Sequence, residues 1–322
     1  MKAPLRWLIG ITVCSWLLGI LRKHRIFVFL YHNVSRSPAP FSIENRLNIP
    51  PAIFERQMRW LKSKFHFSQP DHLLNENQDK DTAMITFDDG FADYFEEALP
   101  ILRKHQIPSL IFLNMAPVDG GTFWAGLLSY LYRSPEFRRI VEELQPNVRF
   151  PDIHPEAVAA YLQENPLDSS DLADYIGRFS TPQMLRAYEA APLVFYGNHF
   201  FNHYSLSVLD ETAINHEYQM NRQALAKYKN HVDCVAIPFG SFGAEHVSML
   251  AATNTRRVFD SEPYPSETSS FVLHRISLTC DDTCGGHILF RLVWPTLRTS
   301  ISNFIRSLKP QRTFDKTPRP TI

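Results

Sequence analysis

Residues Met84–Gly90, with the sequence Met-Ile-Thr-Phe-Asp-Asp-Gly, place two adjacent carboxylates directly after a short apolar run. The apolar part is typical of a buried strand, so Asp88 and Asp89 occupy the turn where the backbone leaves it. Two neighbouring carboxylates in an apolar setting repel each other and resist ionising unless a cation or a proton-transfer role makes use of them. A bound divalent metal ion is the simplest way to offset this electrostatic repulsion.

Strand and helix patterns alternate on both sides of this run. Continuous apolar stretches predict strands at residues 26–31, 83–87, 109–113, 193–196 and 232–237, with weaker candidates at 257–260 and 271–273. Amphipathic spacing predicts helices at residues 52–65, 92–105 and 211–228, and a closing helix at 288–308. This alternation is typical of an α/β fold with a parallel sheet or barrel, in which active residues gather at the carboxyl ends of the strands.

Two regions depart from this alternation. Residues 124–191 carry several helical patterns punctuated by prolines, and we interpret them as a helical insertion in a barrel that spans residues 26–308. The tail at residues 309–322 is basic and rich in proline, which favours disorder. The sequence contains no internal repeat and no glycine-rich phosphate loop.

The N-terminal residues raise the question of membrane association. Residues 7–21 are largely apolar and have basic residues on both sides, but about 20 apolar residues are needed to span a bilayer. No small-residue cleavage site follows, so residues 1–25 fit neither a standard transmembrane helix nor a cleaved signal peptide. We expect an N-terminal apolar helix that either packs on the domain or lies at a membrane surface. The localisation stays open between a bacterial-type cytoplasmic protein and a membrane-associated one.

The overall charge argues against a nucleic-acid partner. Lys plus Arg and Asp plus Glu both number 33, so no net field draws the chain to a polyanion. The hydrophobic content of 44% is ample for a large core. The four cysteines form no C-x-x-C pair and predict free thiols, although Cys280 and Cys284 leave a small loop disulfide or a metal pair as the alternative.

Two histidines four positions apart follow a later predicted strand. His199 and His203 come just after residues 193–196, and a parallel barrel would bring them to the same edge as Asp89. One carboxylate and two imidazoles form a mixed oxygen and nitrogen ligand set with open positions, as a catalytic metal site requires. Taken singly, the acidic pair is better explained as a turn and each histidine as a polar loop residue. Their joint occurrence, each just after a predicted strand, favours a metal-assisted hydrolase.

The two pairs also carry a family resemblance. Thr86–Gly90 together with His199-x-x-x-His203 resembles the paired signature of the NodB-type polysaccharide deacetylases, carbohydrate esterase family 4. The resemblance covers residues 26–275, with the helical insertion poorly matched. It implies a distorted (β/α)7 barrel that hydrolyses the N-acetyl group of an amino sugar in a polysaccharide or glycolipid. Such a reaction belongs to the carbohydrate metabolism of the cell envelope.

The resemblance implies a role for each of the four side chains. Asp88 would be the general base, and Asp89, His199 and His203 would be the metal ligands. The chemistry agrees, because an amide carbonyl is a poor electrophile and a divalent ion both polarises it and acidifies a bound water. Base catalysis adds about two to four orders of magnitude when the carboxylate reaches that water. The ligand set suits Zn²⁺ and also tolerates other first-row divalent ions.

Two further stretches resemble this family. Tyr31–Val34, followed by Pro51–Gln57, is similar to the opening of the subgroup whose chains begin with a YH-x-V strand. Pro238–Gly240 resembles the third motif of the family, in which the backbone N–H of the aromatic residue, here Phe239, helps to bind the oxyanion. The family more often has an arginine two residues before this proline, where this chain has Ala236. A contact that orients the base is therefore missing or supplied elsewhere.

The proton donor for the leaving amine is the least defined part of the resemblance. The last family motif, L-x-H, has no clean equivalent, and Leu273–Arg275 comes closest with its residues in a different order. We favour His32 over His274, because in the YH-x-V subgroup that position faces the pocket. The alternative for His32 is a hydrogen-bonded structural histidine. Trp124, after another predicted strand, either stacks on a sugar ring or serves in core packing or as a lid.

Three interpretations of function follow from these residues. The first is a metal-dependent hydrolase acting on a non-peptide carbon–nitrogen bond of an N-acetylated glycan or glycolipid. The second is a catalytically weak glycan-binding protein on the same barrel, which the absent arginine and the undefined general acid would allow. The third is a membrane-surface scaffold that uses residues 7–21. Retention of both carboxylates and both histidines favours the enzyme.

Overall fold

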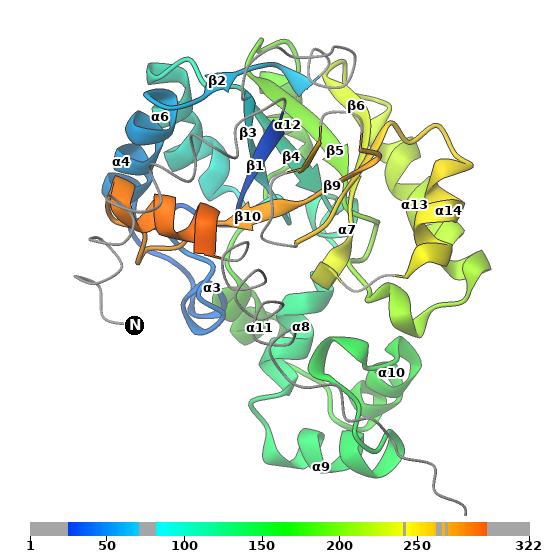
Figure 1. The fold of residues 1–322 in the computed structure, drawn as a ribbon. Helices are drawn as coiled ribbons and strands as arrows, with labels where there is room; N and C mark the ends of the chain where they lie inside the picture. The colour runs from blue at the N-terminus through cyan, green and yellow to red at the C-terminus, as the bar shows by residue number, and fades with distance from the viewer. Residues whose placement is uncertain (1–24, 71–81, 241–242, 262–265, 268–269, 295–322) are drawn as a thin grey trace, which may run out of the picture.

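One ten-stranded sheet forms the centre of the structure, a computed structural model that describes residues 25–70, 82–240, 243–261, 266–267 and 270–294 (Figure 1). Its strands are β1 (Arg25–Tyr31), β2 (His66–Phe67), β3 (Thr82–Phe87), β4 (Ser109–Leu113), β5 (Val194–Asn198), β6 (His231–Ala236), β7 (Arg257–Phe259), β8 (Ser266–Glu267), β9 (Val272–Leu273) and β10 (Arg275–Ser277). The strand order is β10-β1-β3-β4-β5-β6-β7-β9, and each neighbouring pair on this path is parallel. β2 adds to β3 in parallel, and β8 pairs antiparallel with β1. The predicted α/β fold with a parallel sheet is confirmed.

The chain connects the two edges of this sheet directly. β9, at one edge, ends at Leu273, and β10, at the other edge, begins at Arg275, so only His274 lies between them. One residue spans less than about 4 Å, so it cannot cross a flat sheet of this width. The strands therefore curve round until the edges approach each other, which makes the sheet a distorted barrel.

Both faces of the sheet are buried, as β1 illustrates. Ile26 and Val28 belong to a cluster of buried residues that come only from strands, which is the interior of the barrel. Phe27, Phe29 and Tyr31 alternate with them and belong to a second cluster that also contains helix residues. Because side chains alternate between the faces of a strand, a strand covered on both sides has a continuous apolar sequence. This is why the apolar runs predicted these strands well.

Helices cover the outside of the barrel and follow the strands along the chain (Figure 1). They are α3 (Pro40–Glu44), α4 (Pro51–Lys62), α6 (Leu99–Lys104), α7 (Met115–Val118), α13 (Glu211–Leu225) and α14 (Ala244–Ala251), and residues 285–294 are also helical. The single helix predicted at residues 92–105 is instead a π-helical turn, η2 (Tyr94–Ala98), followed by α6. Pro100, the second residue of α6, has no N–H to donate to the preceding turn, which explains the change of helical pattern there.

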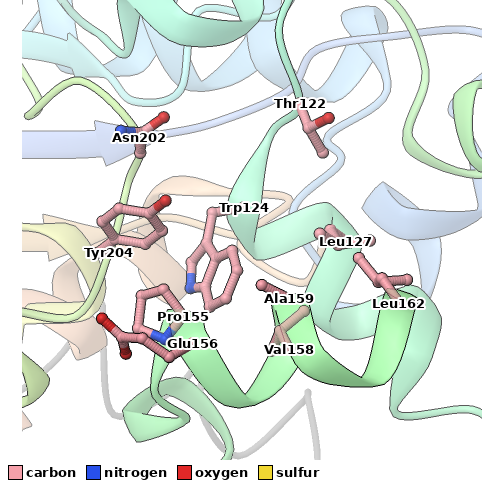
Figure 2. A pocket seen from close by; sticks show the side chains of 10 residues that line it. All are labelled: Thr122, Trp124, Leu127, Pro155, Glu156, Val158, Ala159, Leu162, Asn202 and Tyr204. Carbon is pink, nitrogen blue, oxygen red and sulfur yellow. The ribbon is translucent and has the colours of Figure 1, made fainter. Parts of the chain in front are cut away.

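The region predicted as a helical insertion lies between β4 and β5. It contains α8 (Trp124–Leu131), α9 (Pro135–Leu144), η3 (Phe150–Asp152), α10 (Pro155–Glu164), α11 (Ser169–Ile176) and α12 (Pro182–Tyr188). Figure 1 shows α8, α9, α10 and α11 gathered at one end of the sheet. Trp124 begins α8 and lies beside residues of α10, as Figure 2 shows. Its side chain, with those of Leu128 and Phe137, belongs to a small apolar core that is separate from the barrel.

The N-terminal helix expected over residues 1–25 and the tail at 309–322 lie outside the described residues, apart from Arg25 in β1. Among the helices of the described part of the chain, none is long and apolar enough to cross a membrane. Within the described part of the chain, Cys234, Cys280 and Cys284 form no disulfide.

Candidate metal and acid–base site

The register of the parallel strands brings the polar residues of the loops to one end of the barrel. The last residues of β1 and β3 are paired, so His32 and Asp88 leave the sheet side by side. The last residues of β4 and β5 are also paired, so Asn114 and His199 do the same. Polar side chains from four strands therefore meet at the carboxyl end of the sheet, where α/β folds carry their sites.

The turn after β3 is held in an unusual backbone conformation. Asp89 and Gly90 both have left-handed φ angles, 72° and 86°. Ser180 fixes this turn, because its backbone N–H and its hydroxyl both donate to the carbonyl of Gly90, at 2.9 and 2.8 Å. A left-handed non-glycine residue persists only where its surroundings hold it, and such residues are common at functional sites.

The loop after β5 is held by a network of buried polar side chains. Asn114 donates to the carbonyls of His199 and Phe200, the latter at 2.9 Å. Glu217 on α13 accepts from the backbone N–H of Asn202 at 2.8 Å and from its side-chain amide at 2.7 Å. Asn114 is fully buried and Glu217 is 6% exposed, and their hydrogen bonds orient the loop that carries the two histidines.

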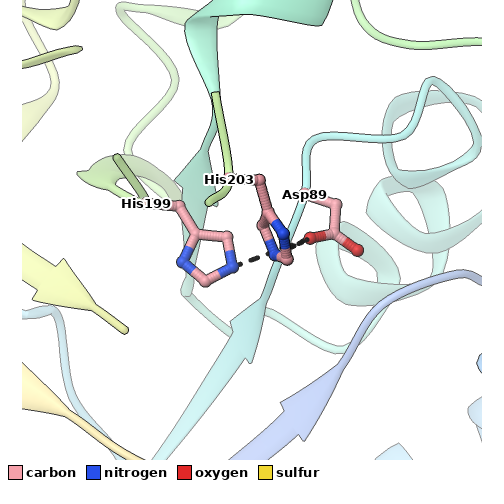
Figure 3. A group of neighbouring side chains, drawn as sticks. All are labelled: Asp89, His199 and His203. Carbon is pink, nitrogen blue, oxygen red and sulfur yellow. Dashed lines mark ion pairs between the residues drawn. The ribbon is translucent and has the colours of Figure 1, made fainter. Parts of the chain in front are cut away.

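Three side chains from the two loops converge on one point (Figure 3). The Oδ1 atom of Asp89 lies 3.6 Å from Nε2 of His199 and 3.3 Å from Nε2 of His203, and one ligand atom from each residue lies within 4.8 Å of the others. Nδ1 of His199 donates to the carbonyl of Ala236 at 2.9 Å, so its Nε2 is free to act as a ligand. The Asp89 Oδ1 atom is buried without a hydrogen-bond partner. A buried, unbonded carboxylate oxygen facing two imidazole nitrogens fits a divalent cation.

The four groups influence one another's protonation. Burial by itself raises the pKa of Asp89, but His199 and His203 outweigh it and hold that pKa below its usual value. Burial lowers the pKa of His199, whereas the charges of Asp88 and Asp89 raise it and prevail. Burial prevails at His203 and lowers its pKa. These shifts favour the carboxylate form of Asp89 and the neutral form of His203, which are the forms that bind a metal, whereas the two carboxylates favour the charged form of His199.

Asp88 has a partner that the sequence did not reveal. Nη1 and Nη2 of Arg275 donate to the two carboxylate oxygens of Asp88 at 2.6 and 2.8 Å, and Nε of Arg275 donates to the carbonyl of Asp260 at 2.8 Å. Arg275 is 1% exposed. Although burial raises the pKa of Asp88, the charges of Arg275 and His199 hold that pKa below its usual value. Asp88 is therefore ionised, with Oδ2 at 3.7 Å from Nε2 of His199.

The register explains how Arg275 reaches Asp88. Arg275 on β10 pairs with Val28 on β1, whose side chain points into the barrel, and the guanidinium lies 5.4 Å from the centre of the Phe112 ring. Adjacent residues of paired parallel strands point to the same face, so Arg275 extends through the interior toward Asp88. The contact expected from an arginine near the third motif, where Ala236 stands, is thus supplied from the last strand. Its only signal in the sequence is an arginine inside the apolar segment 272–278.

The aromatic candidates lie in different environments. Phe239 has a left-handed φ of 57°, and its ring centre lies 4.6 Å from that of His203, with Phe123 at 5.3 Å from the same imidazole. Pro238 is buried in the same turn. Trp124 is 7% exposed and packs edge to face against Tyr204, so it belongs to the core of the insertion beside the site.

The two candidate acids differ in their surroundings. His32 is half-buried directly after β1, and its electrostatic interaction with the two carboxyls contributes to the lowered pKa of both Asp88 and Asp89. His274, between β9 and β10, is 37% exposed, and its Nδ1 lies 2.7 Å from a carboxylate oxygen of Asp260. Of the two candidate acids, His32 is therefore the one that acts electrostatically on the site carboxylates.

Comparison with known proteins identifies the family. The sequence model of the family described as polysaccharide deacetylase matches residues 75–258, which is more than half of the chain. The chain belongs to the polysaccharide deacetylase family. This confirms the resemblance to the NodB-type enzymes. YxkH of Bacillus subtilis (strain 168), whose name assigns it provisionally to the polysaccharide deacetylases, is 30% identical over 92 residues, which cover 27% of this chain and 30% of YxkH.

Several solved structures share the fold of this chain. The deacetylase PplD of Streptococcus pyogenes, in complex with acetate, has a TM-score of 0.58 at 16% identity, over 84% of this chain and 99% of PplD. The polysaccharide deacetylase BC0361 of Bacillus cereus has a TM-score of 0.58 at 13% identity, over 84% of this chain and 69% of BC0361. IcaB of Ammonifex degensii has a TM-score of 0.54 at 16% identity, over 83% and 97%. At these identities the likeness concerns the fold, and it confirms the distorted barrel.

Proposed function

We propose that this polysaccharide deacetylase family member is a metal-dependent hydrolase that removes the N-acetyl group from an amino sugar of a polysaccharide or glycolipid. The observation that carries the proposal is the buried group of Asp89, His199 and His203, with the ionised Asp88 beside it. In this proposal the three residues hold a divalent ion, Zn²⁺ or another first-row metal, and leave open positions for water and substrate.

Each side chain has a distinct part in the proposed reaction. When bound, the divalent ion would polarise the amide carbonyl and lower the pKa of the attacking water. Asp88 removes the proton of that water, and Arg275 holds both carboxylate oxygens so that the base stays ionised and oriented. The backbone N–H of Phe239, next to Pro238, stabilises the oxyanion.

His32 donates the proton that the departing amine needs. Its place beside Asp88 at the end of the paired strands β1 and β3 supports this role, as does its influence on both site carboxylates. Assignment of the chain to the YH-x-V subgroup is part of the same proposal. The matched variants His32→Gln and His274→Gln distinguish the two candidate acids, because only the first is expected to lower kcat, by about two to four orders of magnitude.

The domain division is also a proposal: a barrel over residues 26–308, a helical insertion at about 124–191, an apolar N-terminal segment at 1–25 and a basic tail at 309–322. Membrane contact through residues 7–21 would fit a lipid-linked substrate. Fractionation of cells that express the full chain or a chain without residues 1–25 tests this contact. Equal distribution of both forms in the soluble fraction contradicts it.

Two measurements test the hydrolase itself. Purified protein is loaded with Zn²⁺ and its metal content is compared for the wild type, His203→Ala and His216→Ala, since His216 is an exposed histidine on α13. We expect one ion per chain in the wild type and in His216→Ala, and far less in His203→Ala. Acetate release from an N-acetylated glycan is expected to be abolished by Asp88→Asn. Equal, negligible metal in all three proteins removes the basis of the proposal.

The glycan-binding alternative rested on the missing arginine and on the undefined general acid, and the structure bears on the first of these. Arg275 makes the bidentate contact to Asp88 that an active base needs, so this structural reason for lost turnover is absent from the described site. Binding of an N-acetylated glycan by a metal-loaded protein that releases no acetate would favour the alternative.

A further inference from the structure

The loop at residues 199–203, which carries both candidate histidine ligands, has an unusual backbone. Phe200 and His203 have left-handed φ angles of 60° and 66°. Neither residue is a glycine, and non-glycine residues persist in this region only where the surrounding structure holds them. Because His203 is itself a candidate ligand, the groups that hold this backbone also determine where its imidazole points.

The first residues of this loop are bonded to the ends of two neighbouring strands. The N–H of His199 donates to the carbonyl of Leu113, the last residue of β4, at 3.1 Å. The N–H of Phe200 donates to Oδ1 of Asn198, the last residue of β5, at 2.8 Å. The shape of the histidine loop therefore depends on two acceptors, one carbonyl and one side-chain amide.

Asn221 on α13 lies behind both acceptors. Its Nδ2 donates to the Leu113 carbonyl at 2.7 Å and to Oδ1 of Asn198 at 2.8 Å. Its Oδ1 accepts from the backbone N–H of Met115, the first residue of α7, at 2.8 Å. Asn221 is fully buried. One side chain on α13 thus joins the ends of β4 and β5 to the start of α7.

The amide of Asn198 has a single orientation that satisfies its neighbours. Its Oδ1 accepts from Phe200 and Asn221, and its Nδ2 donates to the carbonyl of Tyr218 on α13 at 3.0 Å. A half-turn of this amide would place Nδ2 against two donors and Oδ1 against the Tyr218 carbonyl. The oxygen of Asn198 therefore stays turned toward the left-handed Phe200.

Loss of Asn221 would weaken this arrangement from behind. Oδ1 of Asn198 would keep one of its two donors, and the N–H of Met115 would lose the acceptor at 2.8 Å. Hydrogen bonds in such a buried network strengthen one another, and a group left unbonded there is costly. The backbone of Phe200 would then be free to leave its left-handed conformation.

We propose that Asn221 is a positioning residue for the metal ligands. Through Asn198 and the Leu113 carbonyl it holds residues 199–203 in shape before an ion binds, so that both imidazoles already face Asp89. The inference rests on the proposed metal-dependent function. It assigns a role to a side chain whose hydrogen bonds in the described structure go to neither histidine.

Two substitutions of buried asparagines by leucine test this role. Asn221→Leu removes the bonds behind the histidine loop and nearly keeps the size of the side chain. Asn230→Leu is the matched control, because Asn230 is also buried and bonds to β5, through the Val194 carbonyl at 2.8 Å, but at the first residue of the strand. Circular dichroism shows whether each variant is folded, and Asn221→Ala removes the same bonds if the leucine is not accommodated.

Hydrogen exchange of the metal-free protein reports on the loop itself. Relative to the N–H groups of β4, we expect those of His199 and Phe200 to exchange at least about tenfold faster in Asn221→Leu than in the wild type. Asn230→Leu is expected to match the wild type in this ratio. Unchanged relative exchange in Asn221→Leu overturns the proposal.

Zn²⁺ affinity, measured by competition with a chelator, reports on the ligands. We expect Asn221→Leu to weaken it by about 10–100-fold and Asn230→Leu to leave it unchanged. The double variant Asn198→Leu with Asn221→Leu should bind Zn²⁺ about as well as Asn198→Leu alone, because both act through one hydrogen bond. Equal affinity of Asn221→Leu and the wild type overturns the proposal, as does a double variant that loses the product of the two single factors.

Acetate release from an N-acetylated glycan separates this inference from the function on which it rests. If the wild type releases acetate and its Zn²⁺ affinity equals that of Asn221→Leu, the positioning role is wrong and the hydrolase stands. If Zn²⁺ affinity depends on Asn221 as expected but the wild type releases no acetate, the hydrolase is wrong and the positioning role stands.

Discussion

Replacing Arg275 by Met removes the partner of a buried carboxylate. Asp88 is 3% exposed and Arg275 is 1% exposed, and the two share hydrogen bonds of 2.6 and 2.8 Å. Leaving one member of such a pair unpaired costs about 3–5 kcal/mol of folding free energy. The lost bond from Arg275 to the Asp260 carbonyl adds about 1 kcal/mol. We therefore expect Arg275→Met to lower the free energy of unfolding by about 4–6 kcal/mol.

The assay is urea unfolding followed by circular dichroism, with Arg103→Met as the control because Arg103 is exposed on α6. Arg275→Lys keeps the positive charge but not the planar guanidinium that donates two hydrogen bonds, so it should lower the free energy of unfolding less than Arg275→Met does. The double variant Asp88→Asn with Arg275→Met should lose less than the sum of the single losses, by about 2 kcal/mol. Additive losses, or an unfolding midpoint of Arg275→Met equal to that of the control, would refute the paired role.

Three further outcomes are expected. Gly90→Ala should lower the free energy of unfolding by about 1–3 kcal/mol more than Gly120→Ala. Both glycines have left-handed φ angles, but of the two only Gly90 would bring its new Cβ against a side chain, at 2.7 Å. Urea unfolding of the two variants decides this. Hydrogen bonds from two serines and Arg149 outweigh burial and lower the pKa of Asp152. The ionised Asp152 therefore stabilises the folded protein fully above the unfolded-state pKa of about 3.9, and this stabilisation is lost as the pH falls through the folded-state pKa. In Asp152→Asn the melting temperature should fall less steeply as the pH is lowered in the acid range, and an unchanged pH dependence counts against this linkage. Zn²⁺ at about 100 times its Kd should stabilise the wild type by about 2.7 kcal/mol and leave His203→Ala unchanged, as differential scanning calorimetry would show; equal shifts in both proteins contradict the proposed ligand.

The parallel sheet was predictable because its strands are buried on both faces. Such strands have continuous apolar sequences that are recognised without knowledge of their partners, as at Ile26–Tyr31. Element ends were less well predicted. The segment at residues 271–273 extends into two strands on opposite edges of the sheet, and residues 92–105 contain a π-helical turn before Pro100. These features depend on which strand lies next to which and on local backbone adjustments, and neither changes the pattern of apolar residues.

The carboxylates and histidines of the candidate site stand out in the sequence because each pair follows a strand of the barrel. Asn114 and Glu217, which hold the histidine loop, give no such signal, since Asn114 is a single polar residue after β4 and Glu217 lies on α13. Their roles arise from hydrogen bonds between segments far apart in the chain. A sequence pattern records the period of an element but not the neighbour that its polar side chains will meet.

By itself the sequence determined an α/β fold and the identity of four polar side chains at the ends of its strands, because these properties follow from local periodicity and from the geometry of parallel sheets. Only the tertiary structure decided that Arg275 meets Asp88 across 187 positions and that Asn221 on α13 meets Asn198 beside the histidine loop. Both are contacts between distant segments, and the free energy that selects them comes from burial and pairing of groups that lie together only in the folded chain.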